Sequence, residues 1–227
     1  YLVCKVPHAT TANSKAIVAY YAERHHAHVH FIPNGINALT PPPEAKEISK
    51  WGLSGGDYIL FAARLVPEKG CHVLAEAFSQ ISWPGMKLVI AGGESFAPDY
   101  VNQLRSLADE RTMFLGHVSG IALQELYANA YAFVLPSAIE GMSNSLLTAM
   151  AYGRPVIVSD IQENLAVIPD FLRNKQFGGR DDIAFKLGDV LDLQSKLTFL
   201  RDHPADAERI GEEIRAYTHA TFSWSTS

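Results

Sequence analysis

DYILFAAR, residues Asp57–Arg64, is an almost uninterrupted apolar run, which predicts a β-strand. A strand without apolar–polar alternation is buried on both faces, as the strands of a parallel sheet are. The next segment, Gly70–Ile81, gathers its apolar residues on one helical face. Together the two segments predict a strand that continues into a helix, which is the repeating unit of α/β folds.

The same order of strand and helix repeats along the chain. Further strands are predicted at Lys87–Ala91, Thr112–Gly116, Tyr131–Ser137 and Pro155–Asp160, and helices at Tyr100–Asp109, Ile121–Ala130 and Ser145–Tyr152. Parallel strands separated by helices require right-handed crossovers. The sequence therefore predicts an α/β fold with a doubly wound parallel sheet, followed by a helical tail.

The composition is that of a globular protein with a sizeable core, since 48% of the 227 residues are hydrophobic. The net charge of -5 argues against a nucleic-acid-binding protein, which would carry a basic face. No apolar run reaches the roughly 18 residues of a membrane span. Cys4 and Cys71 show no pairing pattern, so a reducing, cytoplasmic compartment is expected.

The first 56 residues have a different pattern. A short strand–helix–strand unit is predicted from Ala9–Asn13, Lys15–Glu23 and His28–Ile32, and a turn from Pro33-Asn34-Gly35. We expect residues 1–36 to be the end of a preceding domain and residues 37–227 to form the main domain. Because the chain begins with Tyr1 rather than Met, we expect it to be part of a longer protein.

Three histidines, His26, His28 and His30, alternate with the apolar residues at 27, 29 and 31. The alternation favours a half-buried strand. A metal site is the alternative, but no histidine pair at helical i,i+4 spacing and no nearby cysteine would complete it. We therefore predict no metal site here.

Ligands of an open parallel sheet bind beyond the carboxyl ends of its strands. Arg64 ends the first strand of the main domain, and Lys69 lies where the next helix begins. A guanidinium and an ammonium beside a helix N-terminus can bind phosphate. The alternative is an exposed Arg64 with a Glu68–Lys69 pair, because cations at a helix start oppose the helix dipole.

Two further loops lie at the same predicted edge. Gly92 and Gly93 would let the backbone approach a ligand, or would serve only the turn. In the next loop a base could lie against the main chain around Val118, while His117 either stacks on it or points into solvent, the more ordinary outcome. No G-x-G-x-x-G motif follows a strand, which argues against a dinucleotide oxidoreductase.

The stretch IEGMSNSLLTAM, Ile139–Met150, places an acid one tight turn before a helix. Ser143 or Asn144 can cap that helix, which leaves the N–H groups of residues 144–146 to bind an anion. A carboxylate at Glu140 would then make chemical sense beside a neutral sugar or a developing positive charge. The alternative is an exposed loop glutamate without a ligand.

Six segments in this order resemble glycosyltransferase family 4, the large group 1 family of retaining enzymes with the GT-B fold. They are IPNGIN, AARLVPEKG, LVIAGGE, FLGHVS, LYANAYAFVLPS and EGMSNSLLTAMAYGRPVIVSD, and the final FSW, Phe222–Trp224, resembles the start of the closing segment of the family. The resemblance implies that the sheet is Rossmann-like and that the chain is the C-terminal, donor-binding domain of the GT-B fold.

The resemblance also implies a nucleotide-diphosphate sugar of the UDP, GDP or ADP type as the donor. Arg64 and Lys69 would neutralise its diphosphate, with no metal and no cofactor. Glu140, the first acid of the E-x7-E motif of the family, would hold the sugar and favour an oxocarbenium-like state. The remaining substrate-binding residues would be Gly92, Gly93, His117, Val118, Met142, Ser143, Asn144, Ser145 and Thr148.

Thr148 stands where the family has the second acid of that motif, which commonly binds the ribose. A hydroxyl bonds a ribose less strongly than a carboxylate, so we expect weakened or altered donor binding more than lost chemistry. Asn37 in place of Asp and Gln162-Glu163 in place of Gly-Gly are lesser departures.

The family also needs an N-terminal domain that holds the acceptor, a glycan or a lipid, and this chain carries at most its last residues. We therefore expect the fragment alone to bind donor weakly without transferring sugar, and the full-length protein to be cytoplasmic or peripheral to the cytoplasmic membrane face. One alternative is a non-catalytic nucleotide-sugar-binding or interaction module. A sugar-nucleotide epimerase of the same fold is a weaker alternative, because its acid/base residues are not found.

Overall fold

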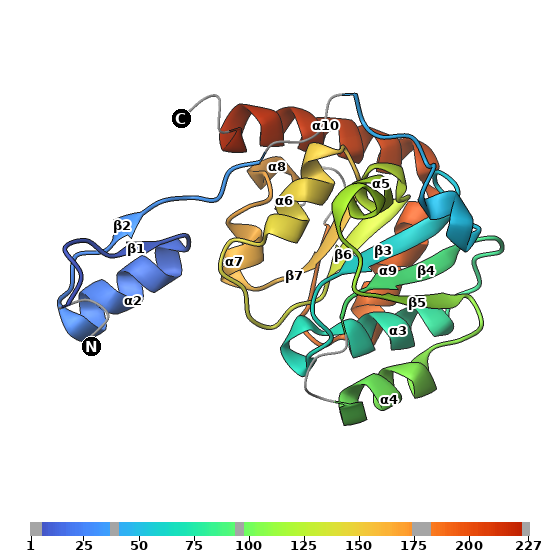
Figure 1. Ribbon diagram of the computed structural model, residues 1–227, viewed down its shortest axis with the longest axis horizontal. Helices are drawn as coiled ribbons and strands as arrows, with labels where there is room; N and C mark the ends of the chain where they lie inside the picture. The colour runs from blue at the N-terminus through green and yellow to red at the C-terminus, as the bar shows by residue number, and fades with distance from the viewer. Residues whose placement is uncertain (1–5, 37–40, 94–97, 174–182, 224–227) are drawn as a thin grey trace.

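The computed structural model describes residues 6–36, 41–93, 98–173 and 183–223. Its centre is a six-stranded sheet in the order β5-β4-β3-β6-β7-β8, in which every pair of neighbours is parallel (Figure 1). The strands are β3 (Tyr58–Ala62), β4 (Lys87–Ala91), β5 (Thr112–Gly116), β6 (Ala132–Leu135), β7 (Val156–Ser159) and β8 (Ala184–Phe185). The predicted doubly wound parallel sheet is confirmed.

Helices cover both faces of the sheet (Figure 1). One face carries α3 (Cys71–Ser79), α4 (Pro98–Leu107) and α9 (Val190–Asp202), and the other carries α5 (Gly120–Asn129), α6 (Asn144–Ala151) and α10 (Pro204–Phe222). Short helical turns occupy η1 (Ile48–Trp51), η2 (Pro67–Lys69), α7 (Gln162–Leu165) and α8 (Asp170–Arg173). The molecule therefore has three layers and two hydrophobic cores, one on each side of the sheet.

Strand β3 shows why an unbroken apolar run marks a central strand. Ile59 and Phe61 face the core beneath α3 and α4, while Tyr58 and Leu60 face the core beneath α5 and α6. All four side chains are fully buried. Since successive side chains of a strand point to opposite faces, only an apolar residue at every position satisfies both cores.

The predicted element limits agree with the structure to within a few residues, and those of β4 and β5 agree at both ends. The predicted strand Tyr131–Ser137 is shorter than expected, because the chain leaves the sheet at Pro136, which has no N–H to donate. Strand β8 and helices α7 and α8 were not predicted from the sequence. These elements have two to four residues, too few to establish a periodic pattern.

The N-terminal segment, residues 6–36, contains β1 (Thr11–Ala12), α2 (Lys15–His25) and β2 (His30–Phe31). The two strands pair in parallel, which confirms the predicted strand–helix–strand unit. This segment lies to the side of the main body (Figure 1), and α2 has no buried side chain. The predicted domain boundary near residue 37 falls outside the described residues, as do Asn37 and Trp224.

The chain enters the main body at Ile36. Its N–H donates to the carbonyl of Phe222 at 2.8 Å, and it forms an isolated bridge with Ser223 just past α10. The point where the chain enters the main body is thus tied to the end of α10. Among the described residues, no helix is both long enough and apolar enough to cross a membrane.

Candidate active site

The strand order contains a point at which the chain changes direction across the sheet. From β3 the chain proceeds to β4 and β5 on one side, and from β6 it proceeds to β7 and β8 on the other side. Since β3 and β6 are neighbours, the loops that follow them lie together at the carboxyl edge of the sheet. In an open α/β sheet this switch point is the ligand-binding crevice. These two loops carry Lys69 and Glu140.

The backbones of the two loops are in direct contact. The Ala138 N–H donates to the Glu68 carbonyl at 2.8 Å. Gly70 has φ +68°, and a Cβ placed on it would lie 2.0 Å from the carbonyl oxygen of Pro136. Glycine therefore allows both the left-handed conformation and the close approach. The approach brings Lys69 opposite the turn that contains Glu140.

Lys69 and Glu140 form an ion pair at the crevice. Lys69 Nζ lies 2.7 Å from Glu140 Oε1 and 3.4 Å from the Ile139 carbonyl oxygen. The side chains are only 16% and 9% exposed, so the exposed-loop alternative for Glu140 is wrong. The alternative Glu68–Lys69 pair does not form, because the Lys69 side chain pairs with Glu140 in the neighbouring loop. A pair this sheltered from water is a strong, charge-assisted contact.

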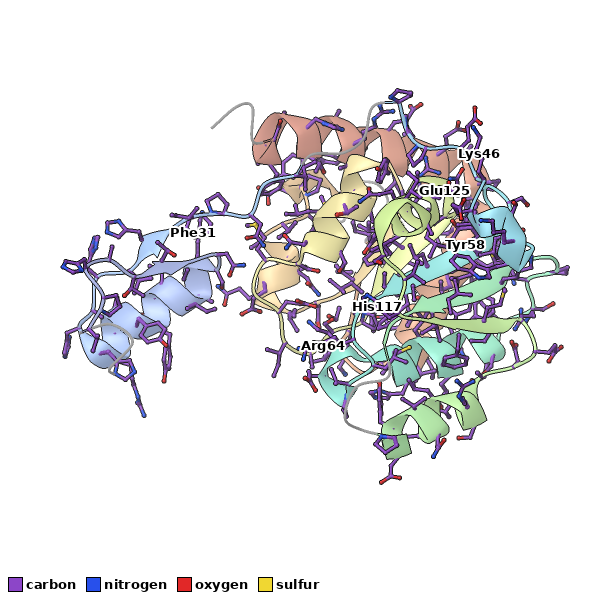
Figure 2. The ribbon with its side chains drawn as sticks, in the orientation of Figure 1. Phe31, Lys46, Tyr58, Arg64, His117 and Glu125 are labelled. Atoms are coloured by element: carbon purple, nitrogen blue, oxygen red, sulfur yellow. The ribbon has the colours of Figure 1, made fainter. Side chains whose placement is uncertain are left out.

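Arg64 is exposed at the end of β3. Figure 2 shows Arg64 at the lower left of the main body and His117 nearer its middle, whereas Lys46 and Glu125 lie at the upper right. Arg64 and Lys69 thus belong to one loop, five positions apart, with Arg64 open to solvent and Lys69 in the ion pair.

The loops after β3, β4 and β5 lie next to one another. A Cβ on Gly92 would lie 2.2 Å from the Ala63 carbonyl oxygen, and one on Gly93 would lie 3.6 Å from Cβ of His117. The absence of a side chain at Gly92 therefore allows the loops after β3 and β4 to pack against each other. His117 is exposed, the outcome that the sequence favoured, while Val118 packs against the core. Residues 94–97 lie outside the described chain.

Helix α6 begins at this edge of the sheet. Ser143 is its N-cap, and its Oγ accepts the N–H of Leu146 at 3.4 Å and lies 2.9 Å from Oγ of Ser145. The prediction that the Leu146 N–H would be free for an anion is therefore wrong, because the cap uses it. The N–H groups of Asn144 and Ser145 lie in the first turn, where a helix has no internal acceptors.

Thr148 lies one helical turn after Asn144, on a half-buried part of α6. Its hydroxyl donates to the Asn144 carbonyl at 2.7 Å. The hydroxyl proton is thus committed to the helix, and only oxygen lone pairs remain for a ligand. This contact is one that a glutamate at the same position would not make.

Two contacts of Met142 with the N-terminal segment were not predicted from the sequence. The Asn34 side-chain amide donates to the Met142 carbonyl at 2.8 Å, and the Asn34 backbone N–H contacts the Met142 sulfur at 3.2 Å. The pattern Pro33-Asn34-Gly35 indicated only a turn. No local signal could pair residues that are 108 positions apart.

The side chain of His72, near the start of α3, contacts the neighbouring helix α4. His72 Nδ1 lies 2.9 Å from the Tyr100 hydroxyl of α4. Burial lowers the pKa of His72 and raises the pKa of Tyr100 to about 12. Both groups are therefore neutral near pH 7, and they join α3 to α4 rather than entering the crevice.

Comparisons with known proteins identify the family of the chain. A family model described as "Glycosyl transferases group 1" matches residues 56–201. Glycogen synthase of Mycobacterium tuberculosis is 30% identical over 203 residues, which are 88% of this chain and 46% of that protein. O-antigen chain mannosyltransferase B of Escherichia coli is 29% identical over 131 residues, 54% of this chain and 34% of that protein. The chain spans about half the length of the first of these relatives and about a third of the second.

Solved structures show the same fold. HepE of Anabaena, crystallised with UDP and glucose, matches 99% of this chain and 62% of its own with a TM-score of 0.84 at 20% identity. Sucrose-phosphate synthase of Thermosynechococcus elongatus matches 95% of this chain and 54% of its own, with a TM-score of 0.76 and 23% identity. The expected GT-B-type, Rossmann-like domain is confirmed, and the chain belongs to the group 1 glycosyl transferase family.

Proposed function

We propose that this chain is the donor-binding half of a retaining, metal-independent hexosyltransferase that uses a nucleotide-diphosphate sugar. The observation that carries the proposal is the sheltered Lys69–Glu140 pair at the point where the strand order reverses. Nucleotide ligands bind at such points in open α/β sheets. HepE, which shares the fold, was crystallised with UDP-glucose, and this supports a sugar nucleotide as the donor.

In this proposal, cations and helix α6 stabilise the leaving diphosphate. Arg64 is exposed and free to meet the phosphates bidentately, and Lys69 lies near enough to Glu140 to contact both phosphate and sugar. The first-turn N–H groups of Asn144 and Ser145 add the positive end of the helix dipole. Charge that develops on the leaving oxygen would be stabilised by groups already in place.

Glu140 has a different role in the same proposal. Its carboxylate holds hydroxyls of the donor sugar and favours the positive charge that develops on the sugar ring. The ion pair with Lys69 fixes the carboxylate before any ligand arrives, so little reorganisation is needed. The base would lie against the main chain around Val118, beside Gly93 and the exposed His117.

The acceptor, a glycan or a lipid, would bind to an N-terminal domain of which residues 1–36 are the end, with residues 37–227 as the donor domain. We propose that these 227 residues alone do not transfer sugar, because the acceptor side of the cleft would belong to that N-terminal domain. One observation favours a second candidate, a non-catalytic nucleotide-sugar-binding module. Thr148, where a ribose-binding acid is expected, gives its proton to the Asn144 carbonyl instead.

Calorimetric titration with UDP, GDP and ADP tests the donor site. We expect one nucleotide to bind, and Arg64→Ala and Lys69→Ala each to raise its Kd at least about tenfold, the size of a lost charge-assisted contact. Lys46→Ala is the matched control, since Lys46 is an exposed lysine away from Arg64, at the upper right of the main body in Figure 2. Equal effects of all three changes, or none, would contradict the assignment.

Thr148→Glu tests the ribose contact in the same titration. A carboxylate at this position accepts ribose hydroxyls more strongly than a threonine oxygen does. If the crevice is a donor site with a weakened ribose contact, Thr148→Glu lowers the nucleotide Kd several-fold. An unchanged or higher Kd would remove residue 148 from the ribose contact.

A further inference from the structure

We propose that Asn34 is a positioning residue that holds the turn Glu140–Met142, so that the N-terminal segment determines how Glu140 meets the donor sugar. This inference rests on the proposed function and extends it to a part of the chain outside the crevice. It concerns the recognition of the sugar by Glu140, whereas Arg64 and Lys69, the cations proposed for the diphosphate, lie in the loop after β3.

Asn34 contacts Met142 twice. Its side-chain Nδ2 donates to the Met142 carbonyl at 2.8 Å, and its backbone N–H approaches the Met142 sulfur at 3.2 Å. Met142 follows Glu140 by two residues and directly precedes Ser143, the N-cap of α6. The contact therefore fixes the short piece of backbone between the acidic side chain and the start of the helix.

A second asparagine supports the first. Asn13 Nδ2 lies 3.4 Å from Asn34 Oδ1, and a Cβ placed on Gly141 would lie 2.9 Å from Asn13 Oδ1. Gly141 thus leaves room for the Asn13 side chain against the turn. The two amides form a chain of contacts from the N-terminal segment to Gly141 and Met142, the two residues that follow Glu140.

Asn34 is itself held from both sides in sequence. Pro33 has a restricted φ, and two residues after Asn34 the Ile36 N–H donates to the Phe222 carbonyl at 2.8 Å. A side-chain amide at this place could have bonded its own turn, as asparagines in turns usually do. Its donor instead reaches a carbonyl 108 positions away, which indicates a role in aligning the two segments.

The effect should concern the sugar more than the nucleotide. Lys69 is placed from the other side of the turn, by the Ala138–Glu68 hydrogen bond and by the contact of Gly70 with Pro136. Loss of the Asn34 contacts would therefore loosen the turn that carries Glu140 and leave the contacts of Arg64 and Lys69 with the diphosphate in place. Small misplacements of a group that touches substrate have large effects on recognition.

Two calorimetric titrations of the full 227-residue chain test this inference, one with the nucleoside diphosphate that binds and one with its glucose ester. We expect Asn34→Ala to weaken binding of the nucleotide sugar about fivefold or more, as for one lost hydrogen bond, and to change the Kd of the diphosphate less than about twofold. Asn34→Asp, which keeps the shape but loses the donor, should act like Asn34→Ala. Asn102→Ala, an exposed asparagine of α4, is the matched control.

Equal weakening of both ligands by Asn34→Ala, or of neither, would overturn the inference while the donor site stands. A wild-type chain that binds no nucleotide would instead overturn the proposed function. For that case the ¹³C carboxyl signal of Glu140, assigned with Glu140→Gln, gives a ligand-free test of the positioning. The signal should move in Asn34→Ala and stay in Asn102→Ala, and an unmoved signal in Asn34→Ala would end the proposal.

Discussion

Gly70 shows how one residue decides the geometry of the crevice. Its φ of +68° is unfavourable for a residue with a side chain, and a Cβ would lie 2.0 Å from the Pro136 carbonyl oxygen. We expect Gly70→Ala to lower the free energy of unfolding by about 3 kcal/mol or more, from backbone strain and overpacking together. Urea denaturation followed by tryptophan fluorescence measures the change.

Gly85→Ala is the matched control for Gly70→Ala. Gly85 has φ +80°, but no atom lies within 4 Å of a Cβ placed there. Gly85→Ala should lower the free energy of unfolding by only about 1–2 kcal/mol, the strain of a left-handed backbone conformation at a residue with a side chain. Equal losses in the two variants would show that the contact with Pro136 contributes nothing, and the account of how Lys69 is placed would need revision.

At the scale of an element, α5 holds η1 through a buried carboxylate. Glu125 is 3% exposed, and its Oε2 accepts the backbone N–H groups of Glu47 at 2.6 Å and Ile48 at 3.1 Å. Figure 2 places it beside Lys46 and Tyr58, away from the crevice. A buried charge with two backbone donors is satisfied, whereas its removal leaves both donors without an acceptor.

We therefore expect Glu125→Ala to lower the free energy of unfolding by about 2 kcal/mol or more. Glu125→Gln should lose less, because its amide oxygen can still accept from both N–H groups. Glu212→Ala, an exposed glutamate within α10, should stay within about 0.5 kcal/mol of the wild type. If Glu125→Ala were as stable as Glu212→Ala in urea, the two hydrogen bonds that Glu125 accepts would not contribute to stability.

At the scale of the whole molecule, the N-terminal segment adds few buried contacts to the main body. Helix α2 has no buried side chain, and the segment lies to one side of the sheet (Figure 1). We expect deletion of residues 1–30 to change the free energy of unfolding of the main body by less than about 1 kcal/mol, because both hydrophobic cores stay intact.

Ile36→Ala provides the contrast in that experiment. Ile36 is 7% exposed and joins the core near Phe222, so its truncation should cost about 2 kcal/mol or more. Thermal unfolding by circular dichroism ranks the two changes. A deletion more damaging than Ile36→Ala would mean that the N-terminal segment is part of the same cooperative unit as the sheet.

The sequence by itself determined the sheet and the loops that form the crevice. Unbroken apolar runs such as Tyr58–Ala62 require two buried faces, and helices between them leave few topologies. The same reasoning located Arg64, Lys69 and Glu140 at strand ends, because the carboxyl edge of such a sheet is where ligands bind. These features depend on the order of apolar and polar residues within short segments, which can be read directly from the sequence.

Only the tertiary structure decided which side chains meet. The Lys69–Glu140 pair joins residues 71 positions apart, and the contact between Asn34 and Met142 joins residues 108 positions apart. Neither pair has a periodic signature, because both arise where the strand order brings loops together. The use of the Leu146 N–H by Ser143 and of the Thr148 proton by Asn144 likewise follows from side-chain rotamers. A sequence lists such donors and acceptors, but the folded backbone sets their distances.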